Sequence, residues 1–146
     1  MAILVVDDAE EIREIFAVVL AEGGYRDVIA LDSALAAFSF LAFAKAPSIE
    51  LMFLDIVMPG IDGIQACARV RSDSRYADVP IVMTTSIEDI ASMDRAFQYG
   101  ATDFLTKPLK AIDILACVRS KTRLKADLEQ RSARERELMQ HVPFQF

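Results

Sequence analysis

The chain has 146 residues, a formal net charge of −6 and 53% hydrophobic residues, a composition typical of one folded domain and not of a disordered chain. Its apolar stretches are shorter than the roughly 20 residues that a membrane-spanning helix needs. Residue 1 also leads directly into a strand-like run, without the basic leader of a secretion signal. We therefore expect a cytoplasmic protein with no membrane segment.

Charge and cysteine placement argue against two further classes. Residues 119–137 carry a net charge of +3, which leaves −9 for the rest of the chain. An acidic body argues against direct nucleic-acid binding by this chain. Cys67, Cys117 and the single histidine, His141, match no metal-binding or redox spacing. We expect the cysteines to be small buried hydrophobic residues, and we expect no zinc site.

Five strand-like runs alternate with five helix-like stretches along the chain. The predicted strands are 2–6, 25–31, 50–54, 79–84 and 103–106, and the predicted helices are 9–21, 33–44, 61–73, 87–99 and 110 onward. This alternation predicts an α/β fold in which helices cover both faces of a parallel sheet. The third strand is apolar without alternation, as strands buried on both faces are.

The predicted helix 33–44 is apolar on nearly all sides. Leu35, Phe38 and Leu41 form one stripe, whereas Phe40 and Phe43 fall largely off it. A helix of this kind is normally covered by other groups. Either it contacts a partner, or the two outlying phenylalanines fold back over sheet edges or loops.

The final predicted helix is too long for a small domain. From residue 110 to about residue 140 it contains neither glycine nor proline. At 1.5 Å per residue it would run about 45 Å, against about 30 Å for the domain itself. Its heptad pattern is weak because Arg131 and Glu135 occupy seam positions. We expect a domain at 1–120 and a helical extension or linker at 121–146, either a signalling helix or a loose coiled coil, with a disordered tail as the alternative.

Polar residues stand where the predicted strands end. Asp7 and Asp8 follow the first strand, Asp55 follows the third, Thr85 closes the fourth, and Lys107 follows the fifth. The carboxyl ends of parallel strands meet at one edge of a sheet, so these side chains are expected to converge there. Alternatively each aspartate merely caps the next helix, but that explanation does not account for the whole set.

Three converging carboxylates need a counterion. Two like charges about 4 Å apart repel by about 1 kcal/mol in water and by several times more near a protein surface. Mg²⁺ prefers hard oxygen ligands and would relieve this repulsion. A carboxylate nucleophile, a metal, a lysine and a hydroxyl together suit phosphoryl transfer onto an aspartate.

These segments resemble the response-regulator receiver domains of two-component signalling. The matching segments are Asp7-Asp8, residues 55–63, Thr85-Ser86 and residues 104–108, in the family's order and spacing. The match covers about residues 1–120. The resemblance implies a flavodoxin-like, doubly wound five-stranded parallel sheet of order 2-1-3-4-5, with the site at its switch point.

The resemblance also implies a role for each residue. Asp55 would be the phosphoacceptor, and the Mg²⁺ ligands would be Asp7 (mainly through water), Asp8, Asp55 and the Val57 carbonyl. Lys107 would contact the phosphoryl group, and Thr85 would bind one of its oxygens. Pro108 completes the turn after Lys107, and the Lys107–Pro108 bond is a candidate for the cis form, which costs little before proline.

Phosphorylation of Asp55 is then expected to change the conformation of a distant surface. The phosphoryl group adds nearly two negative charges. Thr85 would move to meet them, and Phe104 would swing into the vacated space, changing the 87–120 surface. Inverting a 1:99 equilibrium requires about 5.5 kcal/mol, which a few charge-assisted bonds supply. The alternative for Phe104 is a static core aromatic.

The chain has apolar residues at two positions that tend to tune water access in receiver domains, and two other classes of protein are alternatives to the receiver hypothesis. Val57 and Ile87 place apolar groups two residues beyond Asp55 and Thr85, which predicts slow self-dephosphorylation. The first rival class is a phosphohydrolase of the haloacid dehalogenase type, which has a second aspartate two residues after its nucleophile; this chain has Val57 there, which argues against that class. The second is a degenerate or stand-alone adaptor that acts by protein contacts without phosphorylation.

We expect no enzyme activity beyond self-directed phosphotransfer and autodephosphorylation. The expected partners are a sensor histidine kinase or a histidine phosphotransfer protein. A second copy could also bind through the 87–120 face and the C-terminal helix.

Overall fold

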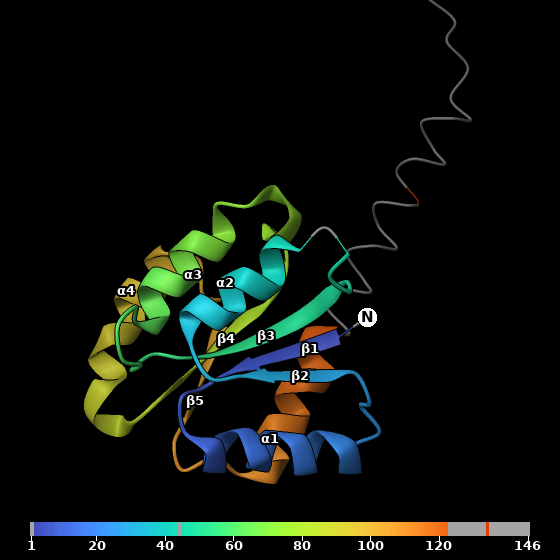
Figure 1. Ribbon diagram of the computed structural model, residues 1–146. Coiled ribbons are helices and arrows are strands. Elements are labelled where there is room, and N and C mark those ends of the chain that lie inside the picture. Colours follow the sequence, from blue (N-terminus) through green and yellow to red (C-terminus); the bar gives the residue numbers. More distant parts are fainter. Residues whose placement is uncertain (1, 44, 123–133, 135–146) are drawn as a thin grey trace, which may run out of the picture.

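The computed structural model describes residues 2–43, 45–122 and 134, and its centre is a five-stranded parallel sheet (Figure 1). The strands are β1 (Ala2–Val6), β2 (Val28–Leu31), β3 (Ile49–Asp55), β4 (Ile81–Thr85) and β5 (Asp103–Thr106). Their order across the sheet is β2-β1-β3-β4-β5, and every neighbouring pair is parallel. The predicted flavodoxin-like fold is therefore confirmed.

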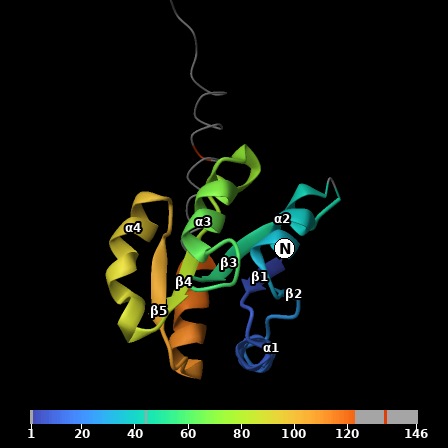
Figure 2. The same cartoon turned by 60° about the vertical axis from the view of Figure 1, so that its left-hand side comes forward.

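Helices cover both faces of the sheet. They are α1 (Glu10–Glu22), α2 (Ala34–Ala42), α3 (Gly63–Arg71), α4 (Met93–Gln98) and a C-terminal helix over residues 111–122. α1 and the C-terminal helix lie on one face, while α2, α3 and α4 lie on the other (Figure 2). Two short 3₁₀ helices, Ser74–Tyr76 and Ile87–Ser92, precede β4 and α4.

The core forms on the two faces of the central strands because successive side chains of a strand point in opposite directions. Met52 joins the cluster under α2, α3 and α4, whereas its neighbour Phe53 joins the cluster under α1 and the C-terminal helix. The Phe53 ring packs against Phe16 of α1, with 4.7 Å between the ring centroids. The edge strands β2 and β5 are mostly half-buried. The central strands thus supply the rigid base for the residues that follow them.

The segment predicted as one helix at 87–99 is divided in two. Residues 87–92 form a 3₁₀ helix with no buried side chain, and α4 begins only at Met93. The Ser86 hydroxyl donates to Asp89 Oδ2 at 2.8 Å and does not cap a backbone N–H. Ile87, Ile90 and Met93 are spaced by three residues, which suits the three-residue turn of a 3₁₀ helix.

The predicted stripe of α2 is confirmed at Leu41, which is buried, and at Phe38, which packs against the core, but it is wrong at Leu35. Ala34, Ala37 and Leu41 face the core, while Leu35 is 64% exposed. The small Ala34 and Ala37 let this helix approach the sheet closely, and Leu35 is left exposed. Phe40 does fold back against the core, but Phe43 is 68% exposed.

Arg71, the last residue of α3, joins four segments on the α3–α4 side. Its guanidinium donates to the Gly100 carbonyl at 2.9 Å and to the Tyr76 carbonyl at 2.8 Å, with longer bonds to the Ala77 carbonyl and to Thr102 Oγ1. Gly100 has φ +110, and a Cβ there would meet the Arg71 side chain. Arg71 therefore fixes the C-terminal ends of α3 and α4 relative to each other.

Replacing Arg71 with methionine should destabilise the fold by about 2–3 kcal/mol, because partly buried carbonyls lose charge-assisted donors. Urea denaturation measures this loss. Arg75→Met is the matched control, because Arg75 is exposed and its guanidinium pairs with the neighbouring Asp73 at 2.7 Å. Exposed ion pairs contribute little to stability, so this control should unfold at nearly the wild-type midpoint. Equal midpoints for the two variants would contradict the role given to Arg71.

The C-terminal helix is described up to Thr122, so the predicted extension at 121–146 lies almost entirely outside the described residues. Within the described part, Lys121 Nζ pairs with Asp103 Oδ2 of β5 at 2.9 Å. Among the described residues, we find no helix with the length and hydrophobicity needed to span a bilayer.

Candidate functional site

Three carboxylates meet at the carboxyl ends of β1 and β3. These strands are direct neighbours, with Val6 beside Leu54, so Asp7 directly after β1 comes close to Asp55, the last residue of β3. One oxygen each from Asp7, Asp8 and Asp55 lies within 4.8 Å of the other two. Asp7 and Asp55 are buried and Asp8 is exposed. The predicted convergence is therefore present, and its open side is at Asp8.

Lys107 reaches the same point from the end of β5. Its Nζ lies 3.0 Å from Asp7 Oδ2 and 3.4 Å from Asp55 Oδ2. Its backbone N–H donates to the Thr85 carbonyl at 2.7 Å, and the following Lys107–Pro108 bond is cis, as predicted. The lysine thus bridges the two buried carboxylates.

The pKa values of Asp55 and Lys107 are both raised, but for different reasons. Burial, with repulsion from Asp7 next, raises the pKa of Asp55 to about 6, although Lys107 partly offsets both. Burial by itself would lower the pKa of Lys107. The hydrogen bond to Asp7 and the attraction of Asp55 outweigh burial and raise that pKa above its usual value. A buried carboxylate whose pKa is raised in this way is a feature of functional sites.

The loop after β3 holds the Asp55 side chain in place. The Val57 N–H donates to Asp55 Oδ1 at 3.3 Å, and the Gly63 N–H donates to the Ile56 carbonyl at 2.8 Å. A Cβ at Gly63 would collide with the Asp55 backbone carbonyl, so only glycine allows this approach. A capping box between Asp62 and Gln65 then begins α3.

Thr85 lies at the rim of the site, at the end of β4. Its side chain is buried, and its hydroxyl donates to the Ser86 carbonyl at 3.1 Å. Phe104 is half-buried on the neighbouring strand, where it packs at the edge of the core and against Phe97 of α4. The two rings are 6.3 Å apart, edge to face. Thr85 therefore follows the residue that pairs with Asp55 in the sheet, and Phe104 contacts α4.

Three contacts at the site were not predicted from the sequence. Arg13 Nη1 donates to the Asp7 carbonyl at 2.8 Å, Asp7 pairs directly with Lys107, and the Ser86 hydroxyl donates to Asp89. The spacing Ser86-x-x-Asp89 resembles the pattern found at helix starts and could have indicated the last pair. Nothing in a single sequence distinguishes Arg13 from other surface arginines.

The donor set fits a magnesium ion. Carboxylate oxygens from Asp7, Asp8 and Asp55 are hard ligands, and exposed Asp8 leaves room for the waters that Mg²⁺ usually keeps. Lys107 supplies only one positive charge against three carboxylates. The site is therefore acidic, and a divalent cation would complete its charge balance.

The family of the chain follows from comparison with known proteins. A family model described as the response regulator receiver domain matches residues 3–119. The chain thus belongs to the response-regulator receiver domains of two-component signal transduction.

Two curated relatives illustrate the range of the family. The "DNA-binding dual master transcriptional regulator RpaA" of Synechocystis sp. is 33% identical over 141 residues, which cover 97% of this chain and 56% of RpaA. "Response regulator PleD" of Caulobacter vibrioides is 34% identical over 133 residues, which cover 91% of this chain and 28% of PleD. The chain thus spans about half of RpaA and less than a third of PleD.

Two solved structures share the fold over nearly their whole length. Chemotaxis protein CheY4 of Vibrio cholerae has a TM-score of 0.74 and 27% identity, covering 82% of this chain and 98% of CheY4. The receiver domain of NtrX from Brucella abortus has a TM-score of 0.69 and 32% identity, covering 83% of this chain and 98% of that domain.

Membership of this family defines the general role of the chain. It is a receiver domain for phosphorylation-based signalling, a class that acts as a switch rather than as an enzyme with a separate substrate. Response regulators receive their phosphoryl group from histidine kinases.

Proposed function

We propose that Asp55 accepts a phosphoryl group from a phosphohistidine, on a sensor histidine kinase or a histidine phosphotransfer protein, in a Mg²⁺-dependent step. The observation that supports this most is the buried Asp55 carboxylate within 4.8 Å of Asp7 and Asp8 and 3.4 Å from the Lys107 ammonium. The protein would act in the cytoplasm, where such donors reside.

In the proposed step, an Asp55 carboxylate oxygen attacks phosphorus and the imidazole nitrogen of the donor leaves. Asp7, Asp8, Asp55 and the Val57 carbonyl would hold Mg²⁺, which supplies positive charge beside the transferring group. Lys107 already contacts Asp55, so its ammonium needs only a small shift to pair with a phosphoryl oxygen. The pKa of Asp55, about 6, leaves this carboxylate ionised near neutral pH.

The proposed switch begins at Thr85. Its hydroxyl would exchange the Ser86 carbonyl for a phosphoryl oxygen, a charged and therefore stronger acceptor. Phe104 would then fill the space beside β4 and change its contact with Phe97 of α4. The output surface at 87–120 would bind a partner or a second copy, without direct nucleic-acid binding by this chain, and residues 121–146 would form a linker to it.

Incubating the protein with acetyl phosphate and MgCl₂ tests the proposal. Intact mass spectrometry should show one added phosphoryl group, and borohydride reduction before peptide mapping should place it on Asp55. Asp55→Asn and addition of EDTA should each abolish the adduct. Asp27→Asn is the matched control, because it removes the same charge at an exposed position. Wild-type labelling in EDTA would contradict the metal requirement, and labelling of Asp55→Asn would contradict the acceptor.

Val57 and Ile87 should prolong the phosphorylated state. These residues are 58% and 72% exposed, and they stand two positions beyond Asp55 and Thr85 in the sequence. Apolar groups there would keep attacking water away from the phosphoaspartate. The double variant Val57→Asn/Ile87→Glu should therefore lose its phosphoryl group about tenfold faster, which corresponds to about 1.4 kcal/mol in the barrier. Decay of the phosphorylated mass with time measures this rate, and an unchanged or longer lifetime would refute the role.

A further inference from the structure

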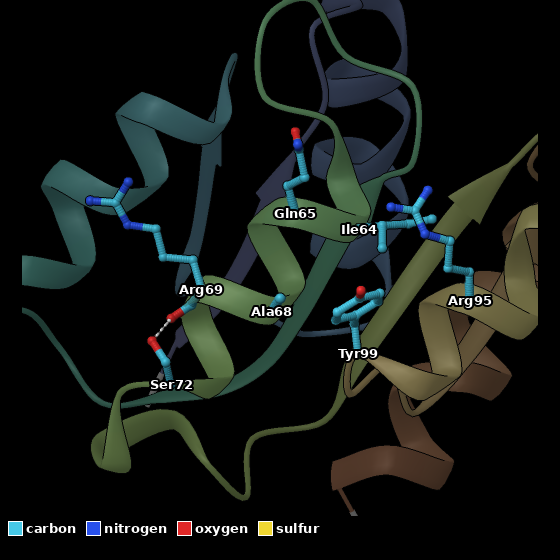
Figure 3. A pocket seen from close by; sticks show the side chains of 7 residues that line it. All are labelled: Ile64, Gln65, Ala68, Arg69, Ser72, Arg95 and Tyr99. Carbon is cyan, nitrogen blue, oxygen red and sulfur yellow. Dashed lines mark hydrogen bonds between the residues drawn. The ribbon is translucent and has the colours of Figure 1, made fainter.

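A groove between α3 and α4 lies outside the phosphorylation site. It measures about 500 Å³, and its lining residues are Ile64, Gln65, Ala68, Arg69, Ser72, Arg95 and Tyr99 (Figure 3). This volume is in the range of about 300–1,000 Å³ that small-molecule pockets occupy. Neither the carboxylates nor Lys107 line it.

The walls of the groove are held at a set separation. Cys67 Sγ on α3 donates to the Tyr99 carbonyl at 3.6 Å, and Arg71 Nε donates to the Gly100 carbonyl at 2.9 Å. Both bonds join α3 to the end of α4, on the side where Tyr99 lies. The groove is therefore formed before any ligand arrives, which lowers the entropic cost of binding.

The groove is lined by apolar groups and by hydrogen-bond donors. Its apolar groups are Ile64, Ala68 and the ring of Tyr99, a residue that is 46% exposed (Figure 3). The Gln65 amide oxygen accepts from the Asp62 N–H at 3.2 Å, which leaves the amide nitrogen as a donor. Arg95 extends from α4 toward Ile64 at the opposite wall.

The arginines of the groove lack carboxylate partners. Among the described residues, no acidic side chain lies within ion-pair distance of Arg69 or Arg95. Arg95 instead lies 5.8 Å from the Tyr99 ring centroid, and Arg69 extends to the α2 side, 4.2 Å from the Phe38 ring centroid. Arg95 thus places a guanidinium beside a half-exposed aromatic ring, with no carboxylate among the described residues to neutralise it.

We infer that the α3–α4 groove binds a small organic anion with a flat apolar body. The body lies on Tyr99, Ile64 and Ala68, and the anionic group pairs with the Arg95 guanidinium, with the Gln65 amide nitrogen as a second donor. Stacking on an aromatic ring and a charge-assisted bond to arginine favour the same kind of ligand. A neutral aromatic molecule lacks the second interaction, and inorganic phosphate lacks the first.

Titration of the ¹⁵N-labelled protein with phenyl phosphate tests the inference. EDTA is present, so that the acidic site stays metal-free and repels the probe. The amide shifts should be confined to α3 and to the residues around Tyr99. Benzyl alcohol and inorganic phosphate should each bind at least about tenfold more weakly, since a tenfold change corresponds to about 1.4 kcal/mol.

Variants identify the groups involved. Arg95→Gln and Tyr99→Leu should each weaken phenyl phosphate binding about tenfold. In each variant, the amide signals of residues away from the substitution should stay at their wild-type positions, which shows that the protein is folded. Arg119→Gln, which removes the same charge from an exposed position of the C-terminal helix, should have no effect. Three results would overturn the inference: shifts outside the groove, equal binding of benzyl alcohol or inorganic phosphate, or full affinity in Arg95→Gln.

Discussion

Replacing Asp55 with asparagine is expected to stabilise the metal-free protein by about 2–3 kcal/mol near pH 8. The cause is the buried carboxylate, whose pKa is raised from 3.8 to about 6 by burial first and by Asp7 second. Asparagine keeps the shape of the side chain and removes the charge. Urea denaturation of both proteins in EDTA measures the difference.

The same pKa shift sets a pH dependence. A carboxyl group with a raised pKa binds more protons in the folded state than in the unfolded chain, so folding becomes less favourable as pH rises. For wild-type protein, the Asp55 contribution to the free energy of unfolding should fall between about pH 4 and about pH 6 and then stay constant. The gain in Asp55→Asn should therefore vanish near pH 4.

Two controls bear on this result. Asp27→Asn changes the net charge equally at an exposed position and should shift stability little at any pH. Saturating Mg²⁺ should stabilise wild-type protein more than Asp55→Asn, because the ion binds the folded carboxylates. A gain for Asp55→Asn that is the same at pH 4 and pH 8 would show that the charge is not its cause.

Replacing Lys107 with methionine should destabilise the metal-free protein by about 2–3 kcal/mol near pH 8, since two buried carboxylates lose their shared cation. The Lys107 ammonium lies 3.0 Å from an Asp7 oxygen and 3.4 Å from an Asp55 oxygen, and methionine can pair with neither. Lys110→Met is the matched control, because that side chain is exposed and lies three residues further along. Thermal or urea denaturation in EDTA should show a loss of stability only in Lys107→Met.

A double-mutant cycle separates the ion pair from the packing of Lys107. In Asp55→Asn protein, one of the two carboxylates is already neutral, so Lys107→Met should be less destabilising there by about 1 kcal/mol or more. If the two substitutions instead add without coupling, Lys107 does not stabilise the fold through Asp55. We also expect Mg²⁺ to restore the stability of Lys107→Met, because the ion replaces the missing positive charge at the same carboxylates.

Much of the site could be predicted from the sequence because strand ends carry its residues. Asp7, Asp55, Thr85 and Lys107 each stand at or directly after a short apolar run, and parallel strands end at a common edge. Contacts within such a site are harder to predict. The direct bond between Asp7 and Lys107 joins residues 100 positions apart, and its geometry depends on where β1 and β5 lie in the sheet.

Helix phases and boundaries were predicted less well. For α2 the apolar pattern favoured Leu35, but the structure buries Ala34 and Ala37 instead. Size decides this: a helix approaches the sheet through its small residues, and hydrophobicity alone does not measure size. At 87–92 the structure instead has a 3₁₀ helix before α4, with the Ser86 hydroxyl bonded to Asp89 and with Ile87 and Ile90 three residues apart.

The sequence by itself determined the α/β class and the strand ends that carry Asp7, Asp8, Asp55, Thr85 and Lys107, and it made the Lys107–Pro108 bond a candidate for the cis form. These features depend on local periodicity, on composition and on general rules for parallel sheets. Only the tertiary structure decided that Lys107 bridges Asp7 and Asp55, that Arg71 ties α3 to the end of α4, and that a groove with Arg95 and Tyr99 lies between those helices. The physical reason is that each of these contacts joins elements far apart in the sequence, whose separation is determined by core packing and not by any local pattern.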